Sequence, residues 1–318
     1  MSQDPAVLHV PVMLDEVLHW LQPRPNALYV DGTLGLGGHA QAILEQTAPS
    51  GRVVGFEWDD DAAQAARQRL SGYGDRLSIV HGSYGDLVPE LAKLGVVEIE
   101  GLLVDLGVSS LQLDRAERGF SFRTDSVLDM RMDRRSPLTA ASLIAQASEE
   151  QLADIFYHYG EERQARRIAR FLAEAREKEP VATTGRLAAI VAEAVPRKYH
   201  PAKVHVATKV FQALRIAVNG ELNNLTRLLQ TAPQVLAEGA RVCIITFHSL
   251  EDRIVKQAFQ NNPAYEVVTR RPVEPSAEEI RRNPRARSAK LRVARRGKSG
   301  RDAMCSRGSK EVQKEDRT

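Results

Sequence analysis

Three carboxylates hold equivalent places in the sequence, each closing a run of strand-forming residues. Asp31 ends the run 27–31, Glu57 ends the run 51–57, and Asp105 ends the run 100–105. The carboxyl ends of parallel strands meet at one edge of a sheet, and open α/β sheets bind their ligands there. We therefore expect these three carboxylates to converge on one ligand.

The residues after Asp31 predict what kind of ligand this is. They form a glycine-rich turn, Asp31-Gly-Thr-Leu-Gly-Leu-Gly-Gly-His39, followed by a helix-forming stretch at 40–45. Glycine lets the backbone approach a ligand closely, so a strand, this turn and a helix N-terminus predict a nucleotide-like ligand. The glycines fit the G-x-G-x-x-A pattern of dinucleotide sites, and Glu57 lies 20 residues past Gly37, the distance of a ribose-binding acid.

NAD and S-adenosylmethionine both fit this spacing, and charge decides between them. A carboxylate at Asp31 repels the pyrophosphate of NAD but attracts an ammonium or a sulfonium group. S-adenosylmethionine carries both, together with ribose hydroxyls for Glu57. Tyr84 follows a third strand-like run at 76–82 and is placed to cover the adenine ring. The residues therefore favour S-adenosylmethionine.

The elements that must position these residues alternate between strand and helix over the first 106 positions. Such alternation predicts a doubly wound, mostly parallel α/β sheet. After it we expect a long charged loop at 107–133, helices throughout 139–195 and one longer helix at 206–229. A buried strand at 240–247 resumes the sheet, and 265–269 and 291–294 are candidate closing strands.

This order predicts a sheet domain interrupted by a helical insertion. The expected parts are 1–135, the first part of the core; 136–205, an inserted helical domain for substrate recognition; 206–298, the second part of the core; and 299–318, a basic, disordered tail.

Charge and composition restrict the partners. Residues 270–318 carry 16 Lys and Arg against 7 Asp and Glu, a net charge of +9 that leaves −6 on the preceding residues. A basic region on an acidic body predicts nucleic acid as partner, with a solubilising tail as the alternative. The sequence contains no run of about 18 apolar residues, so we expect no membrane span. Cys243 and Cys305 lack metal-site spacing, so we expect no metal and a reduced, cytoplasmic protein.

Seven motifs, taken in order, carry a resemblance to one family. They are HVPVMLDE at 9–16, DGTLGLGGH at 31–39, DLGVSS at 105–110, RGFSF at 118–122, LDMRMD at 128–133, FQALRIAVN at 211–219 and FHSLEDR at 247–253. The chain closely resembles the bacterial ribosomal small-subunit methyltransferase H family, also called the MraW family, over about residues 9–296. The resemblance implies a class I adenosylmethionine-dependent methyltransferase fold. It also implies methylation of N4 of a cytidine in the decoding region of 16S rRNA on the 30S subunit, and it leaves a homodimer open.

The turn, the strand ends and the resemblance together predict a set of cofactor-binding residues. They are Asp31, Gly35, Gly37, Gly38, His39, Glu57, Tyr84, Asp105 and Gln112. Gln112 is implied by the resemblance alone. Glu57 stands where the family often has Asp, and Tyr84 where it often has Phe. An alternative for His39, at a helix start, is donation to a backbone carbonyl.

Cytosine N4 is a poor nucleophile because its lone pair is delocalised into the ring, so the enzyme must hold an N4 hydrogen and align the nitrogen with the methyl group. Related enzymes often use an Asn/Asp-Pro-Pro-Tyr/Phe turn after the fourth strand, where this chain has Asp105-Leu-Gly-Val. We predict Asp105 as the acceptor, with Ser109 near the base and His248 and Ser249 facing the same pocket. Alternatively, Asp105 caps the loop, His248 is a core residue and Ser249 caps a helix.

Further predictions concern RNA. The basic residues of 270–298 are expected to contact phosphates, while Phe120 and Phe122 stack on a base taken out of its stack. An internal ion-pair network that holds the loop is the alternative for Asp129, Arg131 and Asp133. The arginines of 163–170 could follow phosphates, and a solvated helix face is the alternative for them. Two competing functions are a small-molecule methyltransferase, disfavoured by the basic region, and a non-catalytic RNA-binding factor, disfavoured by the intact acids and glycines.

Overall fold

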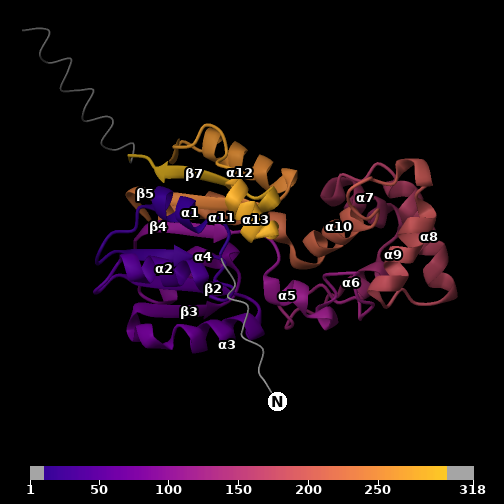
Figure 1. The fold of residues 1–318 in the computed structure, drawn as a ribbon, viewed down its shortest axis with the longest axis horizontal. Coiled ribbons are helices and arrows are strands. Elements are labelled where there is room, and N and C mark those ends of the chain that lie inside the picture. Colours follow the sequence, from indigo (N-terminus) through magenta and orange to yellow (C-terminus); the bar gives the residue numbers. More distant parts are fainter. Residues whose placement is uncertain (1–10, 299–318) are drawn as a thin grey trace, which may run out of the picture. The chain divides into compact units, whose positions relative to one another are not determined.

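The chain divides into two compact units (Figure 1). The structure is a computed structural model that describes residues 11–298, so the predicted tail at 299–318 lies outside the described residues. The first unit holds the residues up to Glu57, Asp61–Gly107 and the residues from Asn224 onward. The second unit holds Trp58–Asp60 and Val108–Asn223.

A seven-stranded sheet forms the centre of the first unit. Its strands are β1 (Leu28–Asp31), β2 (Arg52–Glu57), β3 (Leu77–His81), β4 (Ile99–Asp105), β5 (Leu236–Thr246), β6 (Tyr265–Val267) and β7 (Lys290–Arg296). They lie in the order β3-β2-β1-β4-β5-β7-β6. Strands β1 to β5 pair in parallel, and β7 pairs antiparallel with β5 and β6. The predicted class I methyltransferase fold is confirmed.

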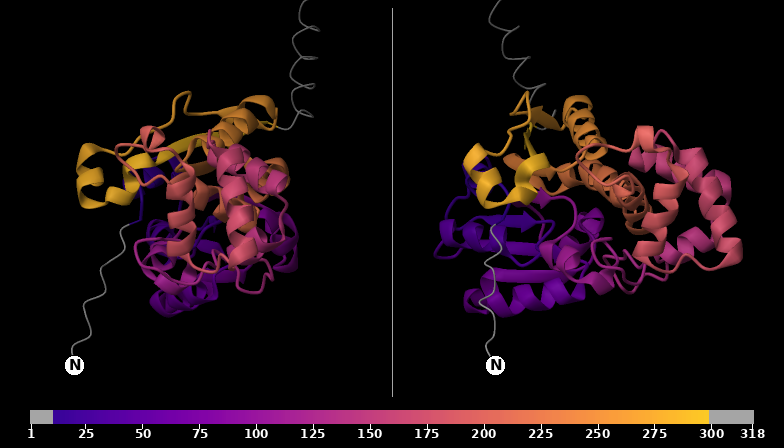
Figure 2. Two further views of the ribbon diagram at one scale, coloured as in Figure 1. Left: turned by 90° about the vertical axis from the view of Figure 1, so that its right-hand side faces the viewer. Right: turned by 45° about the vertical axis from the view of Figure 1, so that its right-hand side comes forward.

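Helices cover both faces of this sheet (Figures 1 and 2). They are α1 (Leu14–Leu21), α2 (Gly38–Gln46), α3 (Asp60–Arg69), α4 (Leu87–Lys93), α11 (Glu221–Thr231), α12 (Ser249–Asn261) and α13 (Ala277–Arg282). Successive strand residues point to opposite faces. Val53 joins the apolar cluster formed with α1, α2 and α3, and Val54 joins the one formed with α4, α11 and α12. The sheet is therefore buried on both sides, as its apolar strands require.

The second unit is helical. Its helices are α5 (Ser110–Asp114), α6 (Ala140–Gln146), α7 (Glu149–Gly160), α8 (Ala165–Lys178), α9 (Thr184–Ala194) and α10 (Thr208–Asn219). Phe156, Leu172 and Leu214 are buried in its single apolar core. A capping box begins α7: Ser148 Oγ accepts from Gln151 N at 3.1 Å, and Gln151 Oε1 accepts from Ser148 N at 2.8 Å.

This unit is wider than the insertion expected at 136–205. Its core extends in both directions because Met130 and Met132 of the preceding loop and Phe211 of α10 are buried in it. The single helix expected at 206–229 is wrong, since α10 ends at Asn219 and the left-handed Gly220 after it, with a φ of 60°, separates it from α11. Within residues 11–298, no helix is long and apolar enough to cross a bilayer.

Candidate active site

The glycine turn after β1 packs tightly at two positions, and at one of them its backbone is left-handed. Gly37 has a φ of 78°, and a Cβ there would lie 2.5 Å from Leu70 Cδ1. A Cβ at Gly38 would lie 3.1 Å from Pro11. The backbone N–H of Gly35 donates to Glu57 Oε2 at 2.8 Å. Glu57 at the end of β2 therefore holds the turn in place from the neighbouring strand.

Asp31 lies at the base of this turn with 1% of its surface exposed. Its Oδ1 accepts from Thr33 N at 3.1 Å, whereas its Oδ2 has no hydrogen-bond partner among the described residues. Burial raises the pKa of Asp31 to about 6, although the nearby His39 opposes this rise. The carboxylate is thus costly to ionise until a cation approaches it.

His39 and Asp105 complete a group of three polar side chains with Asp31. The buried His39 is the second residue of α2, and its Nε2 lies 3.8 Å from Asp105 Oδ2. Neither ring nitrogen of His39 has a hydrogen-bond partner in the described part of the chain, and neither does Asp105 Oδ1. Asp105 N donates to Thr33 Oγ1 at 2.6 Å and so ties β4 to the turn. His39 therefore makes no bond to a described backbone carbonyl.

The unpartnered atoms test whether S-adenosylmethionine fits. A buried polar atom without a partner costs about 1–3 kcal/mol, so several together indicate an absent ligand. Here they are carboxylate oxygens of Asp31 and Asp105 and both nitrogens of His39. Two carboxylates attract a cation with N–H and O–H donors and repel a pyrophosphate. The residues fit an ammonium- and sulfonium-bearing ligand with ribose hydroxyls.

Tyr84 lies after β3 in the short 3-10 turn Tyr84–Asp86. It is 4% exposed and belongs to the apolar cluster on the α4 side of the sheet. A Cβ placed on Gly32, next to Asp31, would lie 3.3 Å from Tyr84 Cβ. The structure thus brings Tyr84 beside the turn, as the sequence predicts.

His248, and not Ser249, caps α12. His248 Nδ1 accepts from Glu251 N at 3.4 Å, and Glu251 Oε2 accepts from Phe247 N at 2.8 Å and from His248 N at 3.3 Å. The alternative of Ser249 as cap is therefore wrong. His248 Nε2 also lies 3.1 Å from Glu251 Oε1. The first turn of α12 therefore holds the imidazole. His248 follows β5, whose Ile245 pairs with Asp105 at the end of β4.

Ser109 and Gln112 belong to the second unit and form a capping box there. Ser109 Oγ accepts from Gln112 N at 3.3 Å, and Gln112 Oε1 accepts from Ser109 N at 3.1 Å. Gln112 Nε2 donates to Asp59 Oδ2 at 2.9 Å. Both ends of the Gln112 amide are thus bonded inside this unit, and Gln112 is 3% exposed.

Arg118 is a structural residue that sequence reasoning did not single out. It is 1% exposed, its Nη1 lies 2.5 Å from Asp59 Oδ2, and its Nη2 donates to Arg131 O at 2.9 Å. A buried arginine needs such partners. The available signals were its place at the start of the RGFSF motif and an acid two residues after Glu57.

The charged loop at 107–133 is held by ion pairs, as the alternative interpretation expects. Arg131 Nε lies 2.7 Å from Asp129 Oδ1, and Arg135 Nη2 lies 2.8 Å from Asp133 Oδ2. Phe120 is 8% exposed and packs in the core of the second unit, and Phe122 is half-buried beside that core. Stacking of either ring on a base stays a prediction.

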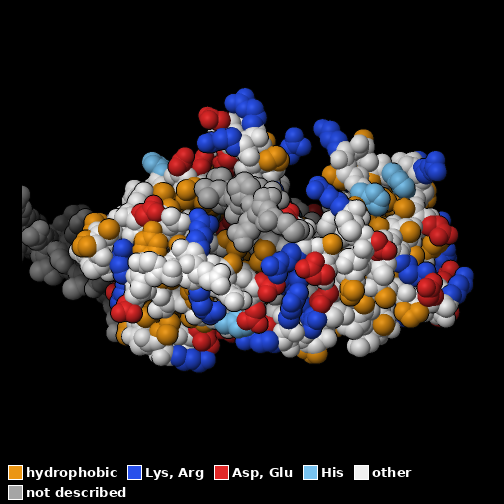
Figure 3. Space-filling model, turned by 60° about the horizontal axis from the view of Figure 1, so that its bottom comes forward, with side chains coloured by type: hydrophobic (Ala, Val, Ile, Leu, Met, Phe, Trp, Pro, Cys, Tyr) orange, Lys and Arg blue, Asp and Glu red, His pale blue; other side chains and the backbone are white. Residues whose placement is uncertain are grey.

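Part of the predicted phosphate-binding region is used internally. Arg292 is 7% exposed and its Nε lies 2.6 Å from Asp252 Oδ1, while Arg295 Nη2 lies 2.5 Å from Glu266 Oε2. Arg296 donates to Pro233 O and Ala264 O. On the face drawn in Figure 3, Lys and Arg side chains are interspersed with Asp and Glu. A count of basic residues therefore overstates the surface available to phosphates.

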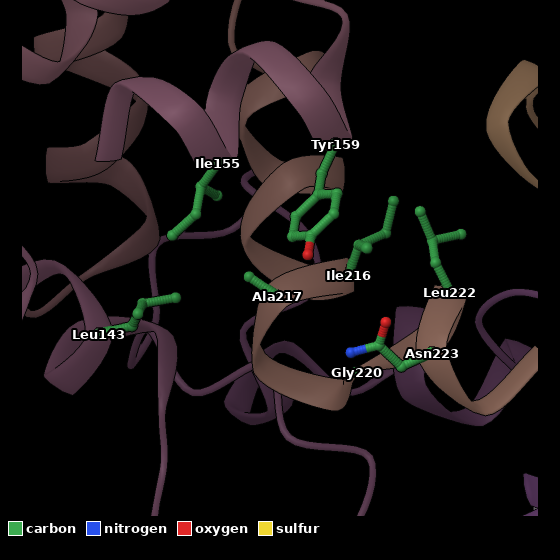
Figure 4. A pocket seen from close by; sticks show the side chains of 8 residues that line it. All are labelled: Leu143, Ile155, Tyr159, Ile216, Ala217, Gly220, Leu222 and Asn223. Carbon is green, nitrogen blue, oxygen red and sulfur yellow. The ribbon is translucent and has the colours of Figure 1, made fainter. Parts of the chain in front are cut away.

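A separate cavity of about 230 Å³ lies in the second unit (Figure 4). Its lining residues are Leu143, Ile155, Tyr159, Ile216, Ala217, Gly220, Leu222 and Asn223. Its surface is about equally polar and apolar, with the Tyr159 hydroxyl and the Asn223 amide as the polar side-chain groups. None of the predicted site residues lines this cavity.

Comparisons with known proteins agree with the geometry. A family model described as the MraW methylase family matches residues 6–297. The ribosomal RNA small subunit methyltransferase H of Desulfotalea psychrophila is 55% identical over 291 residues, which are 92% of this chain and 99% of that protein. The protein of that name from Cyanothece sp. is 49% identical, over 92% of this chain and 96% of its own length. These matches confirm the family resemblance and the predicted methyl donor, S-adenosyl-L-methionine.

Proposed function

The chain belongs to the MraW methylase family, and from this premise we propose that it methylates N4 of a cytidine in the decoding region of 16S rRNA, on the 30S subunit. The names of its relatives, ribosomal RNA small subunit methyltransferases, support small-subunit RNA as the substrate. The observation that carries the proposal is the set of buried, unpartnered atoms of Asp31, His39 and Asp105, at the carboxyl ends of β1 and β4 and the start of α2.

In this proposal the glycine turn holds the methyl donor. The Asp31 carboxylate attracts its cationic groups, and Gly37 and Gly38 let the backbone approach it closely. Glu57 supports the turn through Gly35 N and reaches the ribose hydroxyls, while Tyr84 packs against the adenine. When bound, S-adenosylmethionine supplies an electrophilic methyl group.

Asp105 is proposed as the acceptor of an N4 hydrogen. Its Oδ1 is buried and has no hydrogen-bond partner within residues 11–298, so it can accept this hydrogen without losing a described bond. Accepting it concentrates the lone pair on N4 and orients that lone pair toward the methyl carbon. With the donor bound, N4 would gain the methyl group that the donor's sulfur releases, and Asp105 would take the proton that N4 loses.

The other residues expected near the base have supporting parts in this proposal. His248 and Ser249 follow β5, whose Ile245 pairs with Asp105, and Glu251 fixes the His248 ring. Ser109 and Gln112 shape the start of α5, and Gln112 acts through Asp59. Their catalytic and cofactor-binding roles stay predictions.

The test is methyl transfer from labelled S-adenosylmethionine to 30S subunits by the full chain. Nuclease digestion and mass spectrometry then locate the label. We expect one methyl group on N4 of one cytidine in 16S rRNA. Label on a cytosine carbon, a ribose or a ribosomal protein would contradict the proposal, as would equal labelling of a small-molecule extract that contains no RNA.

A further inference from the structure

Residues 197–205, between α9 and α10, form an exposed segment that the functions proposed above do not use. Its sequence, Arg197-Lys-Tyr-His-Pro-Ala-Lys-Val-His205, contains three Lys or Arg, two His and no acid. Every residue in it is exposed. In Figure 3, histidine side chains lie next to Lys and Arg side chains on the helical unit. The segment is therefore a local basic surface in an otherwise mixed one.

An exposed aromatic ring stands in this basic surface. Tyr199 ends the short 3-10 turn Arg197–Tyr199 and is 53% exposed. Lys198 Nζ lies 4.9 Å from the centre of its ring. An exposed ring with an ammonium group over one face can stack a base on its other face and offer an ion pair to the adjoining phosphate.

Both ends of the segment are held against the helical core. His200 Nε2 lies 2.9 Å from Val195 O near the first end. At the other end, His205 Nδ1 accepts from Ala207 N at 3.2 Å, which leaves the proton of the neutral ring on Nε2. The His205 ring stacks on Phe122 with 4.8 Å between ring centres, and Phe122 meets Phe211 at 4.7 Å. The surface is thus built on a row of aromatic rings.

We infer that segment 197–205 binds an unpaired stretch of the substrate RNA, with Tyr199 stacked on a base and Lys198 and Lys203 on phosphates. This inference rests on the proposed function, because it names the surface that holds the same substrate. Unpaired nucleotides expose the base faces that a duplex hides, so an exposed ring favours a single strand. The absence of acids from the segment favours a polyanion over a mixed-charge protein surface.

Binding to RNA without cofactor tests the inference independently of methylation. The probes are a fluorescent single-stranded RNA with the decoding-region sequence, the same strand in a duplex, and 30S subunits. We expect Tyr199→Ala to weaken single-strand binding about tenfold and Tyr199→Phe to preserve it, since stacking needs only the ring. The pair Lys198→Ala and Lys203→Ala should lower the salt dependence, log Kd against log salt, by roughly 1.4.

The second unit supplies matched controls outside the segment. Tyr157 on α7 is 60% exposed, with Asp154 three positions before it and Glu161 four after it in the chain, and Lys178 is exposed at the end of α8. Tyr157→Ala and Lys178→Ala should leave RNA binding unchanged. For the Tyr199 and lysine variants, KM for RNA should rise while kcat and cofactor affinity stay at the wild-type level.

Three outcomes would overturn the inference. They are wild-type RNA binding in Tyr199→Ala, an equal loss in the Tyr157 and Lys178 controls, and a loss seen with 30S subunits but not with deproteinised RNA, which would assign the segment to a ribosomal protein. If the wild-type chain binds the strand through this segment yet methylates no small-subunit RNA, the proposed function fails and the RNA surface stands.

Discussion

Each unit buries a carboxylate within a group of polar side chains. The two groups differ in whether the buried polar atoms have hydrogen-bond partners in the described chain. Asp31 in the first unit is 1% exposed, and Asp59 in the second is 2% exposed. Asp59 Oδ2 receives hydrogen bonds from both Arg118 and Gln112. Asp31 Oδ2 has no partner in the described chain and lies in a group with His39, whose ring nitrogens also lack one.

This difference separates a group that supports the fold from one that awaits a ligand. Burial is nearly equal in the two, so burial alone does not identify a site. The Asp59 group compensates its buried charge with a cation and hydrogen bonds inside the protein. The Asp31 group leaves that compensation to another molecule, and burial, only partly opposed by His39, raises the pKa of Asp31 to about 6.

The largest effect is expected from removing the acceptor in the unsatisfied group. Asp105→Ala should lower kcat for RNA methylation by about 1,000-fold, because a positioned proton acceptor and its charge contribute factors of this order. Cofactor affinity, measured by calorimetry, should fall far less than kcat, because Asp31 and the glycine turn remain. The matched control is Asp75→Ala, at an exposed acid of the same unit, which should keep full activity. Near-normal methylation by Asp105→Ala would refute the assignment.

Substitutions in the hydrogen-bonded Asp59 group are expected to lower the stability of the fold. Arg118→Met leaves Asp59 buried without its cation and should lower the free energy of unfolding by about 3–5 kcal/mol. Thermal unfolding of the cofactor-free chain measures this. The double variant Asp59→Leu with Arg118→Met removes both charges and should recover part of the loss. An Arg118→Met chain as stable as wild type would show that the two groups do not differ in kind.

Asp31→Asn should raise the free energy of unfolding, whereas Arg118→Met should lower it. The pKa of Asp31 is raised in the folded chain, so its contribution to stability is full below pH 3.8 and is lost as pH rises through about 6. Asparagine keeps the acceptor for Thr33 N without the charge. At pH 8 it should stabilise the cofactor-free chain by up to about 3 kcal/mol while weakening cofactor binding. Loss of stability in this variant would contradict a ligand-dependent carboxylate.

The smallest expected effect is a pH dependence of cofactor binding that comes from Asp31. A cationic ligand binds the ionised Asp31, so the proton competes with it below the pKa of about 6. The Kd for S-adenosylmethionine should rise by about tenfold per pH unit below 6 and level off above 7. Titrations of wild type and Asp31→Asn between pH 5 and 8 measure it. The variant should show a flatter profile, and parallel profiles would remove Asp31 from the site.

The sheet and the unsatisfied group could be predicted from sequence because their signals are local. Asp31, Glu57 and Asp105 each end an apolar run, and the parallel sheet brings strand ends together without further information. The glycine turn likewise encodes its own conformation, as the φ of 78° at Gly37 shows.

The satisfied group and the unit boundaries could not be predicted in this way. The bond from Arg118 to Asp59 joins residues 59 positions apart, and no periodicity reports such a pairing. Gly220 is a helix stop signal in the sequence, but it lies inside a run whose apolar pattern continues, and the two signals conflict until the left-handed φ is seen. His248 as a helix cap was hidden because its neighbour Ser249 is the more frequent capping residue.

The place of β7 has a consequence for how the chain is made. β7 lies between β5 and β6, so the sheet stays incomplete until residues 290–296 have been synthesised. The residues of the helical unit end at Asn223, more than sixty positions earlier. On the translating ribosome its core can therefore assemble while the sheet still lacks an inner strand. During that interval the glycine turn, whose partners on β1, β2 and β4 are already present, belongs to an incomplete sheet.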